Sequence, residues 1–300
     1  MGEEIRGEKT LDLSFVASAS NYINFNDLGL SPNLIKFGGF ALRWYSLAYI
    51  VGIFAAYWLV RRMIRLPGAP MAERHTDDLL FWSMLGVILG GRLGYVLFYN
   101  LEAYVDSPLN ALKLWEGGMS FHGGLVGVLL AALWVCRRNG LSFLRVMDYI
   151  AVGVPVGMLL GRLANFINGE LWGRVTDVPW AIIFPASGSL DPRHPSQLYQ
   201  AGLEGLLLLV LLNWLFWRTQ VRYWPGFLAG MFAIGLGLAR FAVEFVREPD
   251  VQRLQMVADT GLSMGQWLTL PLIAVGVWAV VTAKGRRQRV EPFAGTDSVA

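Results

Sequence analysis

Arg162 stands in a run of polar residues that could bind an anion, Gly161-Arg-Leu-Ala-Asn-Phe-Ile-Asn-Gly-Glu-Leu-Trp-Gly173. Arg162 and Asn165 are three positions apart, so on a helix they share one face. A guanidinium offers a planar fork of donors that matches a phosphate, and an amide adds a neutral donor and acceptor. Asn168 and Glu170 follow within the same run. The pattern predicts an anion-binding site; the structural alternative is that Arg162 pairs with a carboxylate and the two asparagines close a helix end.

His122 lies in a second run, Gly117-Gly-Met-Ser-Phe-His-Gly-Gly124. An imidazole can take up and return a proton near neutral pH, so His122 is a candidate general base. The flanking glycines would leave room for a bulky reactant. A lone histidine at a helix end is as often a hydrogen-bonding residue or an interface anchor, and the residues alone leave both interpretations open.

Arg240 and Glu244 form a third constellation, at positions i and i+4 of an apolar stretch, with Arg247 close behind. The simplest interpretation is an internal salt bridge, but a buried pair with an extra arginine nearby can also present positive charge to a ligand. A fourth run, Arg193-His-Pro-Ser-Gln-Leu-Tyr199, leads into a stretch that contains Glu204. Ser196 lacks the G-x-S-x-G context of a nucleophile, so we expect it to cap a helix.

The elements that must position these residues are membrane helices. The chain has 300 residues, 55% of them apolar and 16% charged, against about 25% charged in soluble domains. Seven apolar stretches each approach the ~20 residues that a bilayer requires. We therefore predict an all-α, polytopic membrane bundle with about seven spans, at roughly 40–60, 79–99, 119–136, 149–168, 198–217, 225–246 and 264–283.

Four of these stretches carry an arginine, namely Arg43, Arg92, Arg162 and Arg240. A guanidinium keeps its charge, and placing one in hydrocarbon costs ~2.5–3.5 kcal/mol even on the lenient insertion scale. The economical explanation is an anion that enters the bilayer, and the most abundant anion there is a lipid phosphate. Glycines four apart, as in Gly86, Gly90 and Gly94 or Gly153, Gly157 and Gly161, further predict closely packed helices.

The basic residues predict the orientation, because short cytoplasmic loops are enriched in lysine and arginine. One set of loops is densely basic, with Arg61, Arg62, Arg65, Arg74, Arg137, Arg138, Arg145, Arg218, Arg222, Lys284, Arg286, Arg287 and Arg289. This places the N-terminus outside and the C-terminus in the cytoplasm. We expect an outer segment 1–39, a membrane domain 40–283 with an outer arm at about 169–197, and a basic, disordered tail 284–300. The polar runs and the segments 100–118 and 247–263 then share the outer face.

The sequence suggests no bound cofactor. Cys136 is the single cysteine, which excludes an internal disulfide and a cysteine-cluster metal site. We expect no metal site, no cofactor and no nucleic-acid partner.

Five runs together resemble the prolipoprotein diacylglyceryl transferases of the bacterial inner membrane: GGRLGYVLFYN (90–100), WEGGMSFHGG (115–124), GRLANFINGELWGR (161–174), RHPSQLY (193–199) and ARFAVEFVREPD (239–250). The resemblance covers about residues 40–283 in consistent order. It implies a seven-span enzyme that transfers the sn-1,2-diacylglyceryl group from phosphatidylglycerol to the lipobox cysteine of a prolipoprotein signal peptide. The products would be a thioether-linked lipid and glycerol 1-phosphate, formed at the periplasmic side of the membrane.

By motif position, the family's functional residues fall on Tyr45, His122, Arg162, Asn165, Glu170, Gly173, Arg240 and Glu244. We predict catalytic roles for His122, Arg162 and Arg240, and phosphatidylglycerol binding by Arg162, Asn165, Tyr45, Glu170, Gly173 and Glu244. One position departs from some family members, which carry a tyrosine where this chain has Leu236.

Two questions stay open at this point. The substrate thiol could be activated by His122 or by the positive field of the arginines. A lipid or anion transporter could also use intramembrane arginines, but it would favour repeated halves and polar residues at the membrane midplane. A purely structural scaffold would leave the arginines unexplained.

Overall fold

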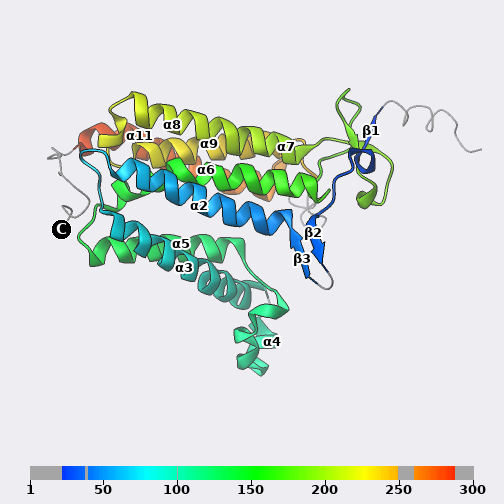
Figure 1. The fold of residues 1–300 in the computed structure, drawn as a ribbon, viewed down its shortest axis with the longest axis horizontal. Coiled ribbons are helices and arrows are strands. Elements are labelled where there is room, and N and C mark those ends of the chain that lie inside the picture. The colour runs from blue at the N-terminus through cyan, green and yellow to red at the C-terminus, as the bar shows by residue number, and fades with distance from the viewer. Residues whose placement is uncertain (1–21, 38–39, 100, 249–259, 288–300) are drawn as a thin grey trace, which may run out of the picture.

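The computed structural model describes residues 22–37, 40–99, 101–248 and 260–287, and it forms an elongated helix bundle (Figure 1). Its long helices are α2 (Trp44–Ile64), α3 (Glu73–Tyr99), α5 (Phe121–Arg138), α6 (Phe143–Ile167), α9 (Phe227–Val243) and α11 (Met264–Ala283). A further rod joins α7 (Ser196–Gln200), the π-helical stretch η5 (Ala201–Leu207) and α8 (Leu208–Arg218). Within the described residues, six helices are long and apolar enough to cross a membrane, and α9 is a shorter apolar helix. The predicted polytopic helix bundle is confirmed.

Short strands and turns connect the helices, which the all-α prediction did not include. β2 (Asn33–Phe37) and β3 (Phe40–Arg43) form an antiparallel hairpin directly before α2. β1 (Ile23–Asn24) pairs in parallel with β4 (Ile182–Ile183), which pairs antiparallel with β5 (Pro192–Arg193). The remaining short elements are η1 (Phe25–Leu28), α4 (Leu101–Asp106), η2 (Pro108–Leu112), η3 (Leu114–Glu116), η4 (Pro185–Ser187), η6 (Val221–Tyr223) and η8 (Lys284–Arg286). Pairing the strands satisfies backbone polar groups where the chain leaves the helices.

The start of α9 shows how a neighbouring helix sets a boundary. The stretch predicted at 225–246 is helical only from Phe227 to Val243. Gly226 adopts the left-handed conformation, with φ of 84°, and therefore precedes the helix. Asp148 of α6 is fully buried and accepts hydrogen bonds from the backbone N–H of Gly226 (2.7 Å) and of Ala229 (2.8 Å). A side chain from α6 thus caps the first turn of α9.

Small residues bring three helix pairs into close contact, as the glycine spacing predicted. In the α3–α5 pair, a Cβ on Gly94 would lie 2.8 Å from the Cα of Gly123. In the α2–α6 pair, a Cβ on Gly52 would lie 3.1 Å from the Cα of Gly157. In the α9–α11 pair, a Cβ on Gly230 would lie 2.8 Å from the Gly276 carbonyl oxygen. Larger side chains would push each pair apart.

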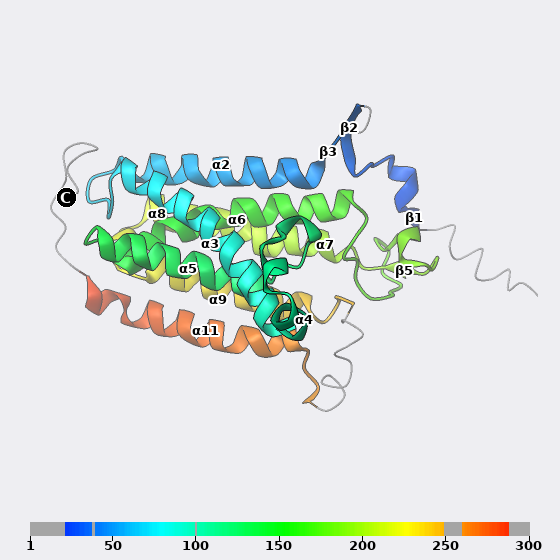
Figure 2. The same cartoon turned by 90° about the horizontal axis from the view of Figure 1, so that it is seen from below.

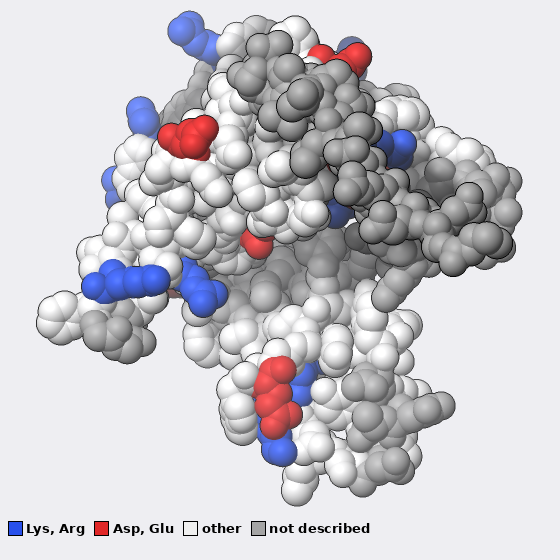
Figure 3. All heavy atoms as spheres, turned by 90° about the vertical axis from the view of Figure 1, so that its right-hand side faces the viewer, with Lys and Arg blue, Asp and Glu red and all other residues white. Residues whose placement is uncertain are grey.

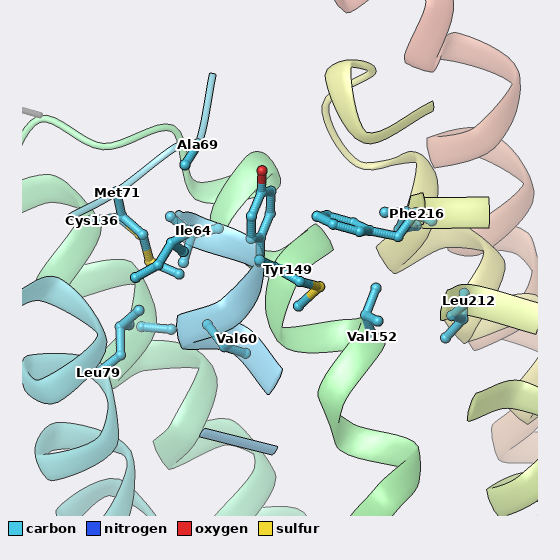
Figure 4. Close-up of a cluster of buried hydrophobic side chains, with 14 of the residues drawn as sticks. Val60, Ile64, Ala69, Met71, Leu79, Cys136, Tyr149, Val152, Leu212 and Phe216 are labelled. Atoms are coloured by element: carbon cyan, nitrogen blue, oxygen red, sulfur yellow. The ribbon is translucent and has the colours of Figure 1, made fainter. Parts of the chain in front are cut away.

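The molecule divides into two parts that we call the body and the lobe. The body contains α2, α6, the α7–α8 rod, α9 and α11, and α6 packs against α2, the rod and α9. The lobe contains α3, α4 and α5. A buried apolar cluster joins the two parts, in which Leu79 and Cys136 of the lobe meet Ile64 of α2 (Figure 4). The same cluster extends to Tyr149 and Phe216, whose rings meet edge to face at 5.1 Å.

This apolar cluster lies near one end of the bundle, which we call the basic end because α2, α5 and α8 each finish there with arginines. Figure 2 shows β1 at the opposite end, here called the site end, and the end of α11 at the basic end. The first and last described residues therefore lie at opposite ends. The side of the membrane that each end faces stays a prediction. Residues 1–21 of the expected outer segment and 288–300 of the expected tail lie outside the described residues.

Towards the site end the lobe diverges from the body (Figure 1). Figure 3 looks onto this end and shows a hollow between the body and the lobe. The end of α6, the segment from 169 to 195 and the segment from 101 to 118 all lie here, so most of the polar runs share one end, as the loop pattern predicted.

Candidate active site

The last turns of α6 carry the first part of the site. Arg162 Nη1 donates to the Asn165 side-chain oxygen at 3.4 Å, which confirms that the two residues share a face. Asn165 Nδ2 donates in turn to Glu170 Oε1 at 2.9 Å, and Asn168 Nδ2 donates to the same oxygen at 3.1 Å. Two amides therefore hold the Glu170 carboxylate beside the helix that carries Arg162.

A tight turn folds Glu170 back onto α6. Gly169 adopts a left-handed φ of 63°, and Leu171 adopts a φ of 59°, which is uncommon for a residue with a side chain. The N-terminal end of α7 holds this turn. Gln197 Nε2 donates to the Glu170 carbonyl at 2.6 Å, and Ser196 Oγ donates to the Leu171 carbonyl at 2.9 Å. The expected helix cap at Ser196 is wrong, because its hydroxyl donates to this turn instead.

The C-terminal end of α9 carries the second part of the site. Arg240 Nη2 lies 3.2 Å from Glu244 Oε2, and Arg247 Nη1 lies 3.9 Å from the same oxygen. The predicted Arg240–Glu244 pair is thus present. Gly265 of α11 packs against the carboxylate, because a Cβ there would lie 2.9 Å from Glu244 Cδ. The site tolerates only a glycine at this point of α11 unless Glu244 moves.

Glu204 joins the two parts. Its Oε2 lies 3.7 Å from Arg162 Nη2, and its carboxylate also interacts electrostatically with Arg240, Arg247 and Glu244. Arg162 likewise interacts with Arg240 and Arg247. Charged side chains from α6, from the π-helical stretch η5 and from the end of α9 thus form one cluster, which we call the arginine cluster: Arg162, Glu204, Arg240, Glu244 and Arg247.

Exposure differs between the cations and the anions of the arginine cluster. The side chains of Arg162 and Arg240 are 27% and 23% exposed, whereas those of Glu204 and Glu244 are 2% and 7% exposed. The carboxylates are therefore inside, and the guanidiniums remain reachable. This arrangement suits binding of an anion that approaches from outside the cluster.

Tyr45 extends the site onto α2. Its hydroxyl lies 3.2 Å from that of Tyr49, and it interacts electrostatically with Arg162 and Glu170. Tyr45 is thus near both predicted anion-binding residues of α6. The residue as a whole is 36% exposed.

Gly173 lies where the segment after α6 crosses the end of α9. Its N–H donates to the His194 carbonyl at 2.8 Å, and a Cβ there would lie 2.7 Å from the His194 Cβ. The neighbouring Arg174 N–H donates to the Val246 carbonyl at 2.8 Å. Gly173 therefore allows a close crossing next to Arg247, with which it forms an isolated β-bridge.

His194 belongs to the same crossing. Its Nδ1 lies 3.2 Å from the Tyr199 hydroxyl, which also accepts a hydrogen bond from Trp180 Nε1 at 2.6 Å. Burial lowers the pKa of His194 below the ordinary histidine value, so the ring is neutral near pH 7. The contact between the His194 ring and the Tyr199 hydroxyl links this segment to α7.

His122 lies on the lobe, whereas the helices that carry the arginine cluster belong to the body. It is exposed near the start of α5, with its ring 5.6 Å from that of Phe121. Among the described residues, no hydrogen bond or ion pair joins it to the cluster. The flanking Gly123 serves helix packing, since a Cβ there would lie 2.9 Å from the Gly94 Cα. That the flanking glycines together make room for a reactant stays a prediction.

Two of the four arginines do not belong to the site. Arg92 is buried and donates to the carbonyl oxygens of Asn110 (2.7 Å), Ala111 (2.8 Å), Lys113 (3.0 Å), Gly117 and Gly118 (3.2 Å). It holds the segment after α4 against α3, so the prediction that its charge awaits an anion is wrong. Arg43 ends β3 and precedes α2 rather than lying within a span.

The fold and the site define a class of protein: a multi-pass helical membrane protein whose arginine cluster opens at one end of the bundle. A family model described as prolipoprotein diacylglyceryl transferase matches residues 32–282. Curated relatives named phosphatidylglycerol–prolipoprotein diacylglyceryl transferase include those of Erythrobacter litoralis, 57% identical over 92% of this chain and 97% of that protein, and of Zymomonas mobilis, 51% identical over 92% and 99%. A third, from Allorhizobium ampelinum, is 49% identical over 88% of this chain and 93% of that protein. The chain belongs to the prolipoprotein diacylglyceryl transferase family.

Sequence reasoning named Glu204 without assigning it a role, and named Arg247 only as an extra positive charge near Arg240 and Glu244. A buried carboxylate inside an apolar stretch was the available signal for Glu204. Its partner could not be identified from spacing, because Arg162 lies on a different helix.

Proposed function

We propose that this chain transfers the diacylglyceryl group of phosphatidylglycerol to the cysteine thiol of a prolipoprotein, as a multi-pass enzyme of the bacterial inner membrane. The names of its relatives support this reaction and its two substrates. These names are those of transferases, which favours the enzyme over the lipid or anion transporter.

Arg162 and Arg240 bind the phosphate of the lipid in this proposal. The observation that carries it is that both guanidiniums are partly exposed while their carboxylate partners are buried. Arg162 uses one N–H on Asn165 at 3.4 Å, and its distance of 3.7 Å from Glu204 is too long for a hydrogen bond. Donors of the fork therefore remain for a phosphate.

Charge on the phosphate increases during the reaction. The thiolate sulfur attacks the carbon of the diacylglyceryl group that carries the phosphate ester. The bond between this carbon and the ester oxygen breaks as the carbon–sulfur bond forms. The leaving oxygen stays with the phosphate, which departs as glycerol 1-phosphate, a monoester with more negative charge than the diester. Arginines held in place before the reaction stabilise this growing charge.

Asn165, Glu170 and Tyr45 complete the lipid site in this proposal. Asn165 makes hydrogen bonds to both Arg162 and Glu170, so it aligns the Arg162 guanidinium with the Glu170 carboxylate. The Tyr45 hydroxyl can donate to an oxygen of the head group. Gly173 supports the site by pairing with Arg247 where the segment after α6 crosses the end of α9. Glu244 supports it by pairing with Arg240.

His122 takes the proton of the substrate thiol in this proposal. A free thiol has a pKa of ~8.5 and must ionise before it attacks carbon. The exposed imidazole contacts the Phe121 ring and makes no hydrogen bond or ion pair within the described residues, so it is available to a substrate. The alternative is that the arginine cluster alone lowers the thiol pKa.

The reaction is tested with purified protein, phosphatidylglycerol labelled in its acyl chains and a peptide that contains a lipobox cysteine. We expect a labelled thioether peptide and release of glycerol phosphate, and no product from the same peptide with serine in place of cysteine. Movement of the lipid between leaflets without labelled peptide would instead identify a transporter. Labelling of single cysteines placed in 169–195 or in 284–287 with a membrane-impermeant reagent tests whether the site end faces the periplasm.

A further inference from the structure

Glu204 is a buried carboxylate to which the proposed reaction assigns no role so far. It is 1% exposed in the middle of an apolar helical rod. A charged group at such a position is costly and is typically retained for a partner or a function. Its Oε2 lies 3.7 Å from Arg162 Nη2, and its Oε1 is buried without a hydrogen-bond partner among the described residues.

The backbone around Glu204 brings it against α6. Residues Ala201–Leu207 form a π-helical stretch, a rare conformation that often occurs at functional sites. The next residue, Gly205, contacts α6 directly, because a Cβ there would lie 2.6 Å from the Leu159 Cα. Leu159 precedes Arg162 by one turn of helix. The rod and α6 therefore approach each other closely beside the Glu204–Arg162 contact.

The length of the Glu204–Arg162 contact matters for what Arg162 can do. A bidentate pair at hydrogen-bond distance would occupy two of the guanidinium donors that a phosphate needs. At 3.7 Å the carboxylate attracts the guanidinium without using those donors. Glu204 also interacts electrostatically with Arg240 and Arg247, so it offsets the repulsion among three arginines in one cluster.

We propose that Glu204 is a positioning residue that holds the Arg162 guanidinium, and the spacing of the arginine cluster, in the geometry that stabilises the departing phosphate. This inference rests on the proposed transferase function. Glu204 is too buried to contact the lipid, and therefore acts through Arg162. Without the charge of Glu204, the arginines still attract the anionic lipid, but the Arg162 guanidinium is no longer held in one orientation.

The proposal predicts a separation of kinetic constants for Glu204→Gln, which keeps the size of the side chain and removes its charge. The rate constant kcat should fall by about 10-fold or more, while KM for phosphatidylglycerol changes by less than about threefold. Glu204→Asp keeps the charge but shortens the side chain, and should lose less of kcat than Glu204→Gln. The matched control is Glu73→Gln at the basic end, where the carboxylate bonds to Arg61 and Arg65 and where we expect kcat unchanged.

The deciding experiment measures both constants for each variant, together with thermal unfolding, and adds the double variant Arg162→Lys with Glu204→Gln. If Glu204 acts through Arg162, its substitution costs much less in the lysine background than in the wild type. Additive losses would overturn the proposal, as would a wild-type kcat in Glu204→Gln. If Glu204→Gln does not fold, a wild-type kcat in Glu204→Asp overturns it, and a reduced kcat at unchanged KM supports it. A wild-type protein without transfer activity would refute the transferase function itself.

Discussion

Replacing Arg162 by lysine tests the phosphate clamp, because the charge stays and only the geometry of the donors changes. Arg162 contacts Asn165 at 3.4 Å with one N–H, and its side chain is 27% exposed. An ammonium is a single point of charge that cannot reach Asn165 and span two phosphate oxygens at once. We expect the loss of one charge-assisted hydrogen bond to the phosphate.

The expected loss of activity follows from the energy of that one hydrogen bond. A hydrogen bond to a charged group contributes about 1.5–3 kcal/mol. With about 1.4 kcal/mol per factor of ten, kcat/KM for phosphatidylglycerol should fall by roughly 10- to 150-fold. A larger share of the loss should appear in kcat than in KM, because the phosphate charge grows as the leaving group departs.

The assay is the purified transfer reaction with labelled phosphatidylglycerol and a lipobox peptide, with the amount of folded protein measured for each variant. Arg65→Lys is the matched control, since Arg65 is exposed and pairs with Glu73 at the basic end. We expect this control to stay within about twofold of wild type, as is usual for surface charges. A value of kcat/KM within twofold of wild type for Arg162→Lys would refute the clamp.

Three further variants separate catalytic from structural roles. Replacing Arg240 and Glu244 together by leucine should leave a folded but inactive protein, because the phosphate loses a ligand; recovery of activity relative to the single variants would show that the pair is only structural. His122→Gln should lower the transfer rate by ~10²–10⁴-fold at neutral pH and recover partly as pH approaches ~8.5, where the substrate thiol ionises unaided. Parallel pH profiles for the two proteins would argue that the arginine cluster activates the thiol. Arg92→Met should destabilise the lobe by about 3 kcal/mol or more, since it leaves several backbone carbonyls without their donor, and limited proteolysis within 101–118 should become faster; an unchanged cleavage rate would contradict the structural role of Arg92.

The sequence predicted contacts within a single helix well. The Arg162–Asn165 hydrogen bond and the Arg240–Glu244 ion pair both follow from helical spacing, which depends only on local backbone geometry. The membrane helices were equally predictable, because a bilayer requires long apolar stretches whatever their neighbours are. The glycine spacing indicated which faces pack closely, as between Gly94 and Gly123.

The same reasoning failed where a partner came from another segment. Arg92 and Arg162 both stand in apolar stretches after a glycine, and the polar neighbours of Arg162 do not show what satisfies Arg92. The carbonyl oxygens that satisfy Arg92 belong to residues 110–118, whose turns depend on how that segment folds back onto α3. The short strands, such as β1 paired with β4, were missed for the same reason, since each strand is too short to show a pattern of its own.

The sequence alone thus determined the membrane helices and which residues share a helix face, because hydropathy and helix periodicity are properties of neighbouring residues. Only the tertiary structure decided that Arg162 and Arg240 share one cluster, that Glu204 joins them, and that His122 lies on the lobe instead of the body. Distances between helices depend on how closely their backbones approach. Contacts such as Gly205 against Leu159 set that approach, and they exist only once the whole bundle has packed.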